Sequence, residues 1–186
     1  MNDFIISCLE RLKEKNIPNA DIDLRVLLNY SKYSKNEIIL SSFNLDQINI
    51  NLFNNVLNRR LSNEPISKII NKKNFWKDEF FVNEFVLDPR PETEGIVEEC
   101  IKLIKNKNAS IKILDIGTGS GALAISLSRE FINANIKAID ISEEAIEVAK
   151  VNINNKKLNN QIQLKKTTID NINEKFDLIV SNPPYL

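Results

Sequence analysis

The fold is decided by residues 111–121, which read IKILDIGTGSG. The first six residues form an apolar, β-branched run that predicts a buried strand. Glycine adopts positive φ at no steric cost and lets a backbone approach a ligand closely, so the three glycines predict a tight turn. The Ala- and Leu-rich stretch 122–130 then predicts a helix. Strand, glycine turn and helix in this order indicate a ligand site at the turn.

Two acidic residues indicate which class of ligand the glycine turn binds. The next apolar run, 136–139, ends at Asp140, about twenty positions beyond the glycine turn, where a carboxylate can accept both hydroxyls of a ribose. The motif lacks the third glycine of G-x-G-x-x-G, and Asp115 lies two residues before Gly117. That carboxylate would repel a pyrophosphate and attract a sulfonium with an α-amino group. The pattern therefore favours S-adenosylmethionine over NAD.

The last apolar run, 176–181, leads into the tetrapeptide Asn182-Pro183-Pro184-Tyr185. Two prolines fix φ twice and remove two N–H donors, so the carbonyls of Asn182 and Pro183 can accept from a substrate. The Asn182 side-chain carbonyl adds a third acceptor, and Tyr185 offers a flat face. Because the tetrapeptide follows a predicted buried strand, it indicates a binding site for the –NH2 group of a planar amide or base.

Together these motifs resemble the N5-glutamine methyltransferases that modify class I peptide chain release factors. The resemblance covers nearly the whole chain and includes residues 88–94, DPRPETE, which are similar to a Pro-Arg-Pro-(Glu/Asp)-Thr-Glu segment of that family. It also includes Glu64-Pro65-Ile66, followed by Phe75-Trp76. It implies methyl transfer from S-adenosylmethionine to the side-chain amide nitrogen of the glutamine in the Gly-Gly-Gln motif of class I release factors.

The resemblance also implies roles for individual residues. The Asn182 side chain and the Pro183 carbonyl would accept the two N–H bonds of the substrate glutamine, and Pro184 and Tyr185 would sandwich its amide plane. The cofactor-binding residues would be Gly117, Thr118, Gly119, Ser120, Gly121, Asp140, Ile169 and Asn182. One departure is visible: where the family has an acid–aromatic pair flanking the adenine, this sequence has Thr168 and Ile169, with Asp170 just beyond.

Composition limits the alternatives. The 186 residues include 25 basic and 25 acidic side chains, so no overall positive field attracts nucleic acid. Without histidine we expect neither a histidine general base nor an ordinary zinc site, and we expect no metal. Cys8 and Cys100 fall in apolar helical patterns typical of buried thiols in a reducing compartment. No run approaches the roughly twenty apolar residues of a membrane span, and we expect a cytoplasmic protein.

We expect three regions. Residues 1–70 have helical periodicity and predict a small all-α substrate-recognition domain, whose longest helix would begin after an N-cap at Asp46. A β-hairpin linker would occupy 71–90, with strand-like residues also at 85–87. Residues 91–186 alternate strands and helices, with Ser142 expected to cap the helix from Glu143. This alternation predicts an α/β, Rossmann-like methyltransferase domain with a parallel sheet.

Three more strands normally follow the fourth strand in methyltransferases of this class. We therefore expect a sheet that is incomplete at its C-terminal side, with 176–181 as an exposed edge. Two alternatives to protein methylation stay open. One is amino methylation of nucleic acid at adenine N6 or guanine N2, which uses the same tetrapeptide but normally needs a basic surface. The other is an inactive truncated fragment that only binds cofactor or partner.

Overall fold

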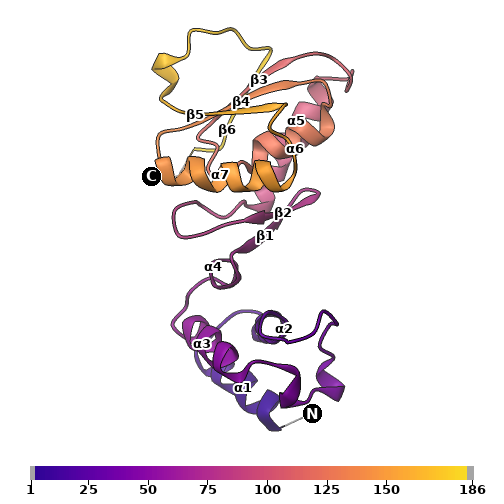
Figure 1. Cartoon of the computed structure of the whole chain (residues 1–186), viewed down its shortest axis with the longest axis vertical. Coiled ribbons are helices and arrows are strands. Elements are labelled where there is room, and N and C mark those ends of the chain that lie inside the picture. The colour runs from indigo at the N-terminus through magenta and orange to yellow at the C-terminus, as the bar shows by residue number, and fades with distance from the viewer. Residues whose placement is uncertain (1–2, 184–186) are drawn as a thin grey trace. The chain divides into compact units, whose positions relative to one another are not determined.

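The computed structural model describes residues 3–183, and the chain divides between Ile70 and Asn71 into two compact units (Figure 1). Each unit has its own apolar core. Among the helices of residues 3–183, none has the length and apolar run that crossing a bilayer would take.

The first unit is helical. Its elements are α1 (Asp3–Glu14), α2 (Ala20–Tyr30), the 3-10 turns Leu40–Ser42 and Leu45–Gln47, α3 (Ile50–Leu61) and α4 (Ile66–Ile70). Apolar residues at helical spacing meet in one core, where Leu12, Leu27 and Phe53 are fully buried. A largely buried ion pair joins Asp23 of α2 to Arg60 of α3, with an Oδ2–Nε distance of 2.6 Å. Apolar packing and this pair hold α3 against α2.

The expected N-cap at Asp46 is wrong. Asn49 caps α3, because its side chain accepts a hydrogen bond from the backbone N–H of Leu52 at 3.1 Å. Asp46 instead lies in the 3-10 turn Leu45–Gln47, which Asn44 and Gln47 close with a reciprocal capping box. The extended backbone of Ile48 and Asn49 then separates that turn from the helix.

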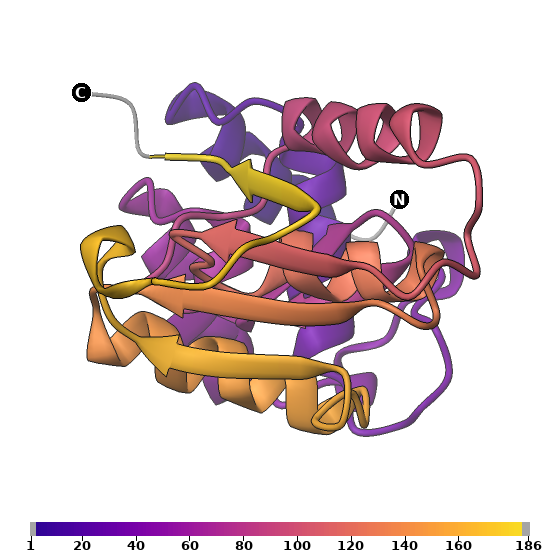
Figure 2. The same ribbon diagram turned by 90° about the horizontal axis from the view of Figure 1, so that it is seen from above.

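The second unit contains the sheet. Its elements are β1 (Lys72–Phe75), β2 (Asp78–Phe81), α5 (Pro91–Leu103), β3 (Lys112–Ile116), α6 (Ala122–Glu130), β4 (Asn135–Asp140), α7 (Glu143–Asn155), β5 (Ile162–Lys166), a 3-10 turn (Ile169–Asn171) and β6 (Leu178–Ser181). Four strands are parallel in the order β5-β4-β3-β6, as Figure 2 shows. This confirms the predicted Rossmann-like sheet, with β6 at an edge of the described strands.

Helices α6 and α7 lie on the same side of the sheet, between it and the β1–β2 hairpin (Figure 1). The side chains that fill this layer include Ile113, Ile136 and Phe131, which are all fully buried. Ser142 caps α7 as expected, because its hydroxyl accepts from the N–H of Ala145 at 3.1 Å. The core of the unit therefore fixes the strand ends at which the two sequence motifs lie.

The hairpin is a part of this core. Phe75, Phe80 and Val82 are buried in the apolar cluster of the second unit. The strand expected at 85–87 does not form, and residues 82–90 have no regular secondary structure. Phe85 is 55% exposed and unpaired with any strand. Apolar character alone suggested a strand there, but the last hydrogen bonds that continue the hairpin are those between Val82 and Asn71.

The side-chain amide of Asn152, in α7, connects three segments. Its Oδ1 accepts from the N–H of Phe81 at 2.7 Å, and its Nδ2 donates to the Phe81 carbonyl at 2.9 Å. The same Nδ2 donates to the carbonyl of Ser120, in the glycine loop, at 2.9 Å. Asn152 is 1% exposed. It pairs with the edge of β2 as a neighbouring strand would and ties the glycine loop to the hairpin.

Replacing Asn152 by Ala should lower the free energy of unfolding by roughly 2–4 kcal/mol, since it leaves buried backbone groups of Phe81 and Ser120 unpaired. Urea denaturation followed by circular dichroism measures the change. Asn154→Ala is the matched control, because Asn154 lies on the exposed side of the same helix. Equal stability of the two variants would contradict the bridging role.

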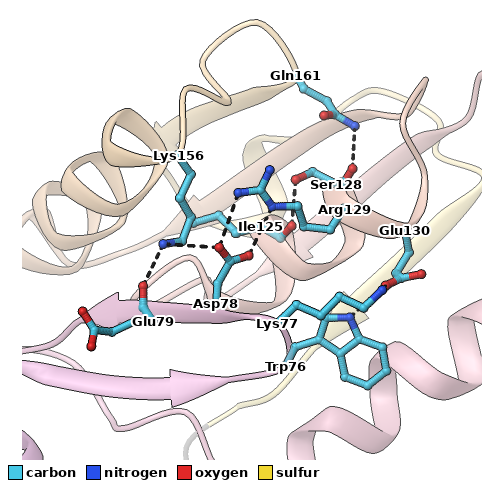
Figure 3. A network of polar contacts seen from close by, with 10 residues as sticks. All are labelled: Trp76, Lys77, Asp78, Glu79, Ile125, Ser128, Arg129, Glu130, Lys156 and Gln161. Atoms are coloured by element: carbon cyan, nitrogen blue, oxygen red, sulfur yellow. Dashed lines mark hydrogen bonds and ion pairs between the residues drawn. The ribbon is translucent and has the colours of Figure 1, made fainter.

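A buried carboxylate, that of Glu130, binds the turn between β1 and β2. Glu130, at the end of α6, accepts from Trp76 Nε1 at 2.9 Å and forms ion pairs with Lys77 and Lys107 at 2.5 and 2.9 Å. Figure 3 shows Trp76 and Lys77 at Glu130, with Asp78 between Arg129 and Lys156 alongside. Burial raises the pKa of Glu130, but hydrogen bonds from Lys77, Lys107 and Trp76 outweigh it and lower the pKa to about 2.

Because the pKa of Glu130 is lower in the folded chain than its usual value near 4.5, its ionised form stabilises the fold above that value. Glu130→Gln should lower the free energy of unfolding at pH 7 by about 2 kcal/mol. The difference from wild type should shrink as pH falls from about 4.5 toward 2. Urea titrations at pH 7 and pH 3 test this, with the exposed pair variant Glu99→Gln as control. A difference that is the same at both pH values would refute it.

Candidate functional site

A cavity of about 520 Å³ opens at the carboxyl ends of β3, β4 and β6. Both sequence motifs reach it. Of the residues expected to bind cofactor or substrate, those that line it are Gly117, Thr118, Gly119, Ser120, Asp140, Ile169, Asn182 and Pro183. Pro184 and Tyr185, expected around the substrate amide, lie outside the described residues. The topology thus gathers residues that are more than sixty positions apart in sequence.

The glycine loop is fastened to the end of β4. Gly117 and Gly119 have φ of +69° and +54°, and a Cβ at either would meet no atom within 4 Å. Within the protein, these two positions favour glycine because of their backbone conformation and not because of crowding. The N–H groups of Gly117 and Thr118 both donate to the Ile139 carbonyl at 2.9 Å. The loop therefore has a fixed shape around the cavity.

Asp140 is held in place from two sides. Its Oδ2 accepts from the N–H of Gly119 at 2.9 Å, and its Oδ1 accepts from the N–H of Ser142 at 3.1 Å. A carboxylate has further lone pairs, so each oxygen can still accept from a ligand hydroxyl. Its position at the tip of β4, on the cavity, fits the expected contact with a ribose.

Gly121 lies elsewhere. It caps α6 with φ of +79°, and a Cβ would come within 3.4 Å of the Ala149 Cβ in α7. It is not among the residues lining the cavity. The structure therefore gives Gly121 a place in the packing of α6 on α7, at the start of the helix.

Asp115 is the buried acid of the site. It is 1% exposed, and its Oδ2 accepts from the Thr118 hydroxyl at 2.7 Å and from the Ala124 N–H at 3.2 Å. Its Oδ1 is buried without a hydrogen-bond partner among the described residues. Burial raises the pKa of Asp115 to about 6. A buried carboxylate oxygen with spare acceptor capacity, beside the cavity, fits a cationic ligand group.

Asn182 follows β6 and is tied to α5. The Ser181 hydroxyl donates to the Ile116 carbonyl at 2.9 Å, which fixes the end of β6 against β3. Asn182 Nδ2 donates to Thr93 Oγ1 at 3.2 Å. Thr93 belongs to the segment 88–94 that the sequence singled out, and it lines the cavity as well. The structure therefore brings this segment and Asn182 together.

A part of the remaining wall is apolar, and Asp88, Ser142, Thr167 and Thr168 line the cavity as well. Ile141 and Ile169 line it and are 71% and 44% exposed, and Phe85 and Leu87 line it with 55% and 67% exposed. Sequence reasoning assigned Phe85 to a strand and missed its place on the cavity. The available signal was its position directly before the segment 88–94. These side chains form a surface on which a flat aromatic ring can lie.

The family model of the methyltransferase small domain matches residues 100–186, a range that contains both the glycine loop and Asn182. A release factor glutamine methyltransferase of Buchnera aphidicola subsp. Baizongia pistaciae is 38% identical over 175 residues, which are 93% of this chain and 63% of that protein. Over more than nine tenths of its length, this chain is therefore similar to release factor glutamine methyltransferases. The resemblance inferred from the motifs is thereby confirmed.

Other matches agree on the class. A release factor glutamine methyltransferase of Caulobacter vibrioides is 38% identical over 95% of this chain and 62% of its own length. A solved structure, a tRNA m1G37 methyltransferase of M. jannaschii, matches 61% of this chain and 35% of its own chain, with a TM-score of 0.51 and 24% identity, and shows the shared fold. The chain spans about three fifths of the length of these two release factor glutamine methyltransferases. S-adenosylmethionine is the cofactor of this methyltransferase class.

We expect the ionised side chain of Asp115 to lower the free energy of unfolding and to favour the binding of a cationic ligand. Its folded pKa is raised to about 6 from 3.8, so the cost of its ionisation to folding builds up as pH rises from 3.8 to about 6 and is fully present above that. Asp115→Asn should raise the free energy of unfolding at pH 7.5 by about 1–3 kcal/mol without ligand, and the gain should fade as pH drops through 6 toward 4. Urea denaturation at several pH values measures it.

The same variant should bind S-adenosylmethionine more weakly at pH 7.5, because the buried negative charge is gone. Isothermal titration calorimetry compares the two proteins, with Glu99→Gln as an exposed carboxylate control. Unchanged affinity together with lower stability would show that Asp115 is only a structural residue.

Proposed function

We propose that this chain transfers a methyl group from S-adenosylmethionine to the side-chain amide nitrogen of the glutamine in the Gly-Gly-Gln motif of class I peptide chain release factors. The observation that carries the proposal is the placement of Asn182 on the cavity that also contains Asp115 and Asp140. The same cavity then presents acceptors for a ribose, for a cation and for an amide.

The described residues fit the cofactor. Asp140 would accept the two ribose hydroxyls, Asp115 would face the positively charged methionine portion, and Ile141 and Ile169 would lie against the adenine. Support comes from the unpartnered Oδ1 of Asp115 and from the fixed carboxylate of Asp140. When bound, S-adenosylmethionine supplies an electrophilic methyl group on its sulfonium.

The protein has to orient the glutamine more than deprotonate it. An amide nitrogen is a poor nucleophile because its lone pair is conjugated with the carbonyl. The Oδ1 of Asn182 and the carbonyl of Pro183 would each accept one N–H of the substrate amide, which aims the nitrogen at the cofactor and stabilises positive charge developing on it. Pro184 and Tyr185 would enclose the amide plane. Holding the two reactants in this geometry supplies much of the remaining acceleration.

The sequence relatives named as release factor glutamine methyltransferases favour a release factor as protein partner over a nucleic acid. The formal net charge of zero points the same way. A substrate of the translation apparatus would place the protein in the cytoplasm. Amino methylation of adenine N6 or guanine N2 is the competing activity, since the same acceptors could hold an exocyclic amine.

The test is methyl transfer from labelled S-adenosylmethionine to an unmethylated class I release factor and duplex DNA, offered together. We expect label on the glutamine of the Gly-Gly-Gln motif. Asn182→Ala should lower the rate at least a hundredfold, in the range found when a preorganised transition-state contact is removed. Asn159→Ala, at an exposed position, is the control.

Label in DNA would overturn the assignment of a protein substrate. Retained cofactor binding without transfer to either substrate would show that the chain is the inactive fragment. Transfer that survives Asn182→Ala would reject the role of the tetrapeptide.

A further inference from the structure

Two carboxylates of the cavity receive hydrogen bonds from uncharged groups only. Asp115 and Asp140 lie near the carboxyl ends of the neighbouring strands β3 and β4, and both line the cavity. Among residues 3–183, the donors to these carboxylates are backbone N–H groups and the hydroxyl of Thr118. The cavity lining adds a third carboxylate, Asp88, but contains no lysine or arginine among the described residues.

Elsewhere in the chain, the protein supplies a cation to a buried carboxylate. Asp23 and Glu130 are the other buried acidic residues within 3–183, and they form ion pairs with Arg60 at 2.6 Å and with Lys77 at 2.5 Å. A buried charge without a counter-ion is costly. Asp115 is only 1% exposed, and its Oδ1 has no hydrogen-bond partner in the described part of the chain. The cavity therefore favours a ligand that brings positive charge.

The cofactor carries two positive groups, an α-ammonium and a sulfonium, and the reaction removes the charge of the sulfonium alone. Methyl transfer breaks the bond between the methyl carbon and sulfur, and the electron pair stays on sulfur, which becomes an uncharged thioether. The acceptor nitrogen forms the new bond to the methyl carbon and gives up a proton to water. The product, S-adenosylhomocysteine, therefore has one positive charge fewer.

We propose that Asp115 and Asp140 make the cavity selective for the charged form of the cofactor, so that methyl transfer itself weakens the binding of the product. The adenine, ribose, ammonium and carboxylate groups are common to both molecules, and their contacts cancel in a comparison. The difference is the attraction between the sulfonium and the carboxylates, which is strong where water is excluded. This inference rests on the cofactor of the proposed function and not on its methyl acceptor.

Both carboxylates can act as charges near neutral pH. Burial, with a smaller contribution from the charge of Asp140, raises the pKa of Asp115 to about 6, so most of it is ionised at pH 7. The same repulsion shows that the two carboxylates lie within electrostatic range of each other. Asp140 accepts from two backbone N–H groups, which favour its ionised form.

The experiment is isothermal titration calorimetry of the full chain at pH 7 with S-adenosylmethionine and with S-adenosylhomocysteine. The quantity compared is the ratio of the two Kd values. We expect wild type to bind S-adenosylmethionine about tenfold more tightly or better, and Asp115→Asn and Asp140→Asn each to reduce this ratio by about threefold or more. Lost contacts with the shared ammonium or ribose cancel in the ratio. Glu99→Gln, which removes an exposed carboxylate, should leave the ratio unchanged.

Equal affinity for the two ligands in wild type, or tighter binding of the product, would overturn the inference. A preference that neither asparagine variant reduces would also overturn it, because contacts of the methyl group would then account for the difference. Binding of neither ligand would reject it together with the cofactor. The titration needs no methyl acceptor, so the expected ratio without transfer to a release factor would reject the proposed acceptor and leave the charge selectivity in place.

Discussion

The buried amide of Asn152 is the constraint on which the rest of the second unit depends. It pairs with the edge of β2 as a neighbouring strand would, and its NH2 group also donates to the Ser120 carbonyl in the glycine loop. A loop without regular secondary structure leaves backbone N–H and C=O groups that need partners from elsewhere in the protein. Asn152 supplies this partner from α7, so the hairpin, the loop and the helix become one rigid support for the cavity.

Two buried carboxylates of the second unit differ in how completely the protein itself supplies their hydrogen-bond partners. Glu130 has Trp76, Lys77 and Lys107 around it, and its pKa falls to about 2. Asp115 has two donors on one oxygen and none on the other, and its pKa rises to about 6. The first carboxylate is satisfied by the protein alone. The second keeps one oxygen without a partner among the described residues, beside the cavity, which is typical of a functional site.

Most of the features that involve residues close together along the chain could be predicted from the sequence. The apolar runs and glycines predicted β3, the loop and α6 almost to the residue, and Ser142 was identifiable as a cap because capping depends on residues within one turn. The place of Asp140 also followed, since parallel strands end at the same edge of a sheet. These features depend on spacing and backbone chemistry alone.

What the sequence could not show depends on contacts between distant segments. Asn152 is separated by 71 residues from Phe81, and Thr93 by 89 residues from Asn182. Their only signal was a polar residue on an otherwise apolar helix face, which indicates a buried partner but does not name it. The N-cap of α3 failed for a related reason, since Asn44, Asp46 and Asn49 are all plausible caps and the backbone path chooses among them.

The β1–β2 turn has a further consequence. Trp76 occupies a position with φ of +53°, where glycine is more usual, and it is the single tryptophan of the sequence. Its indole is bonded to Glu130 inside the second unit, while the helical unit contains tyrosines but no tryptophan. Indole fluorescence is therefore an intrinsic reporter of one unit alone. Compared with a signal from total helix, it can reveal whether the two units lose their structure in one transition or in two.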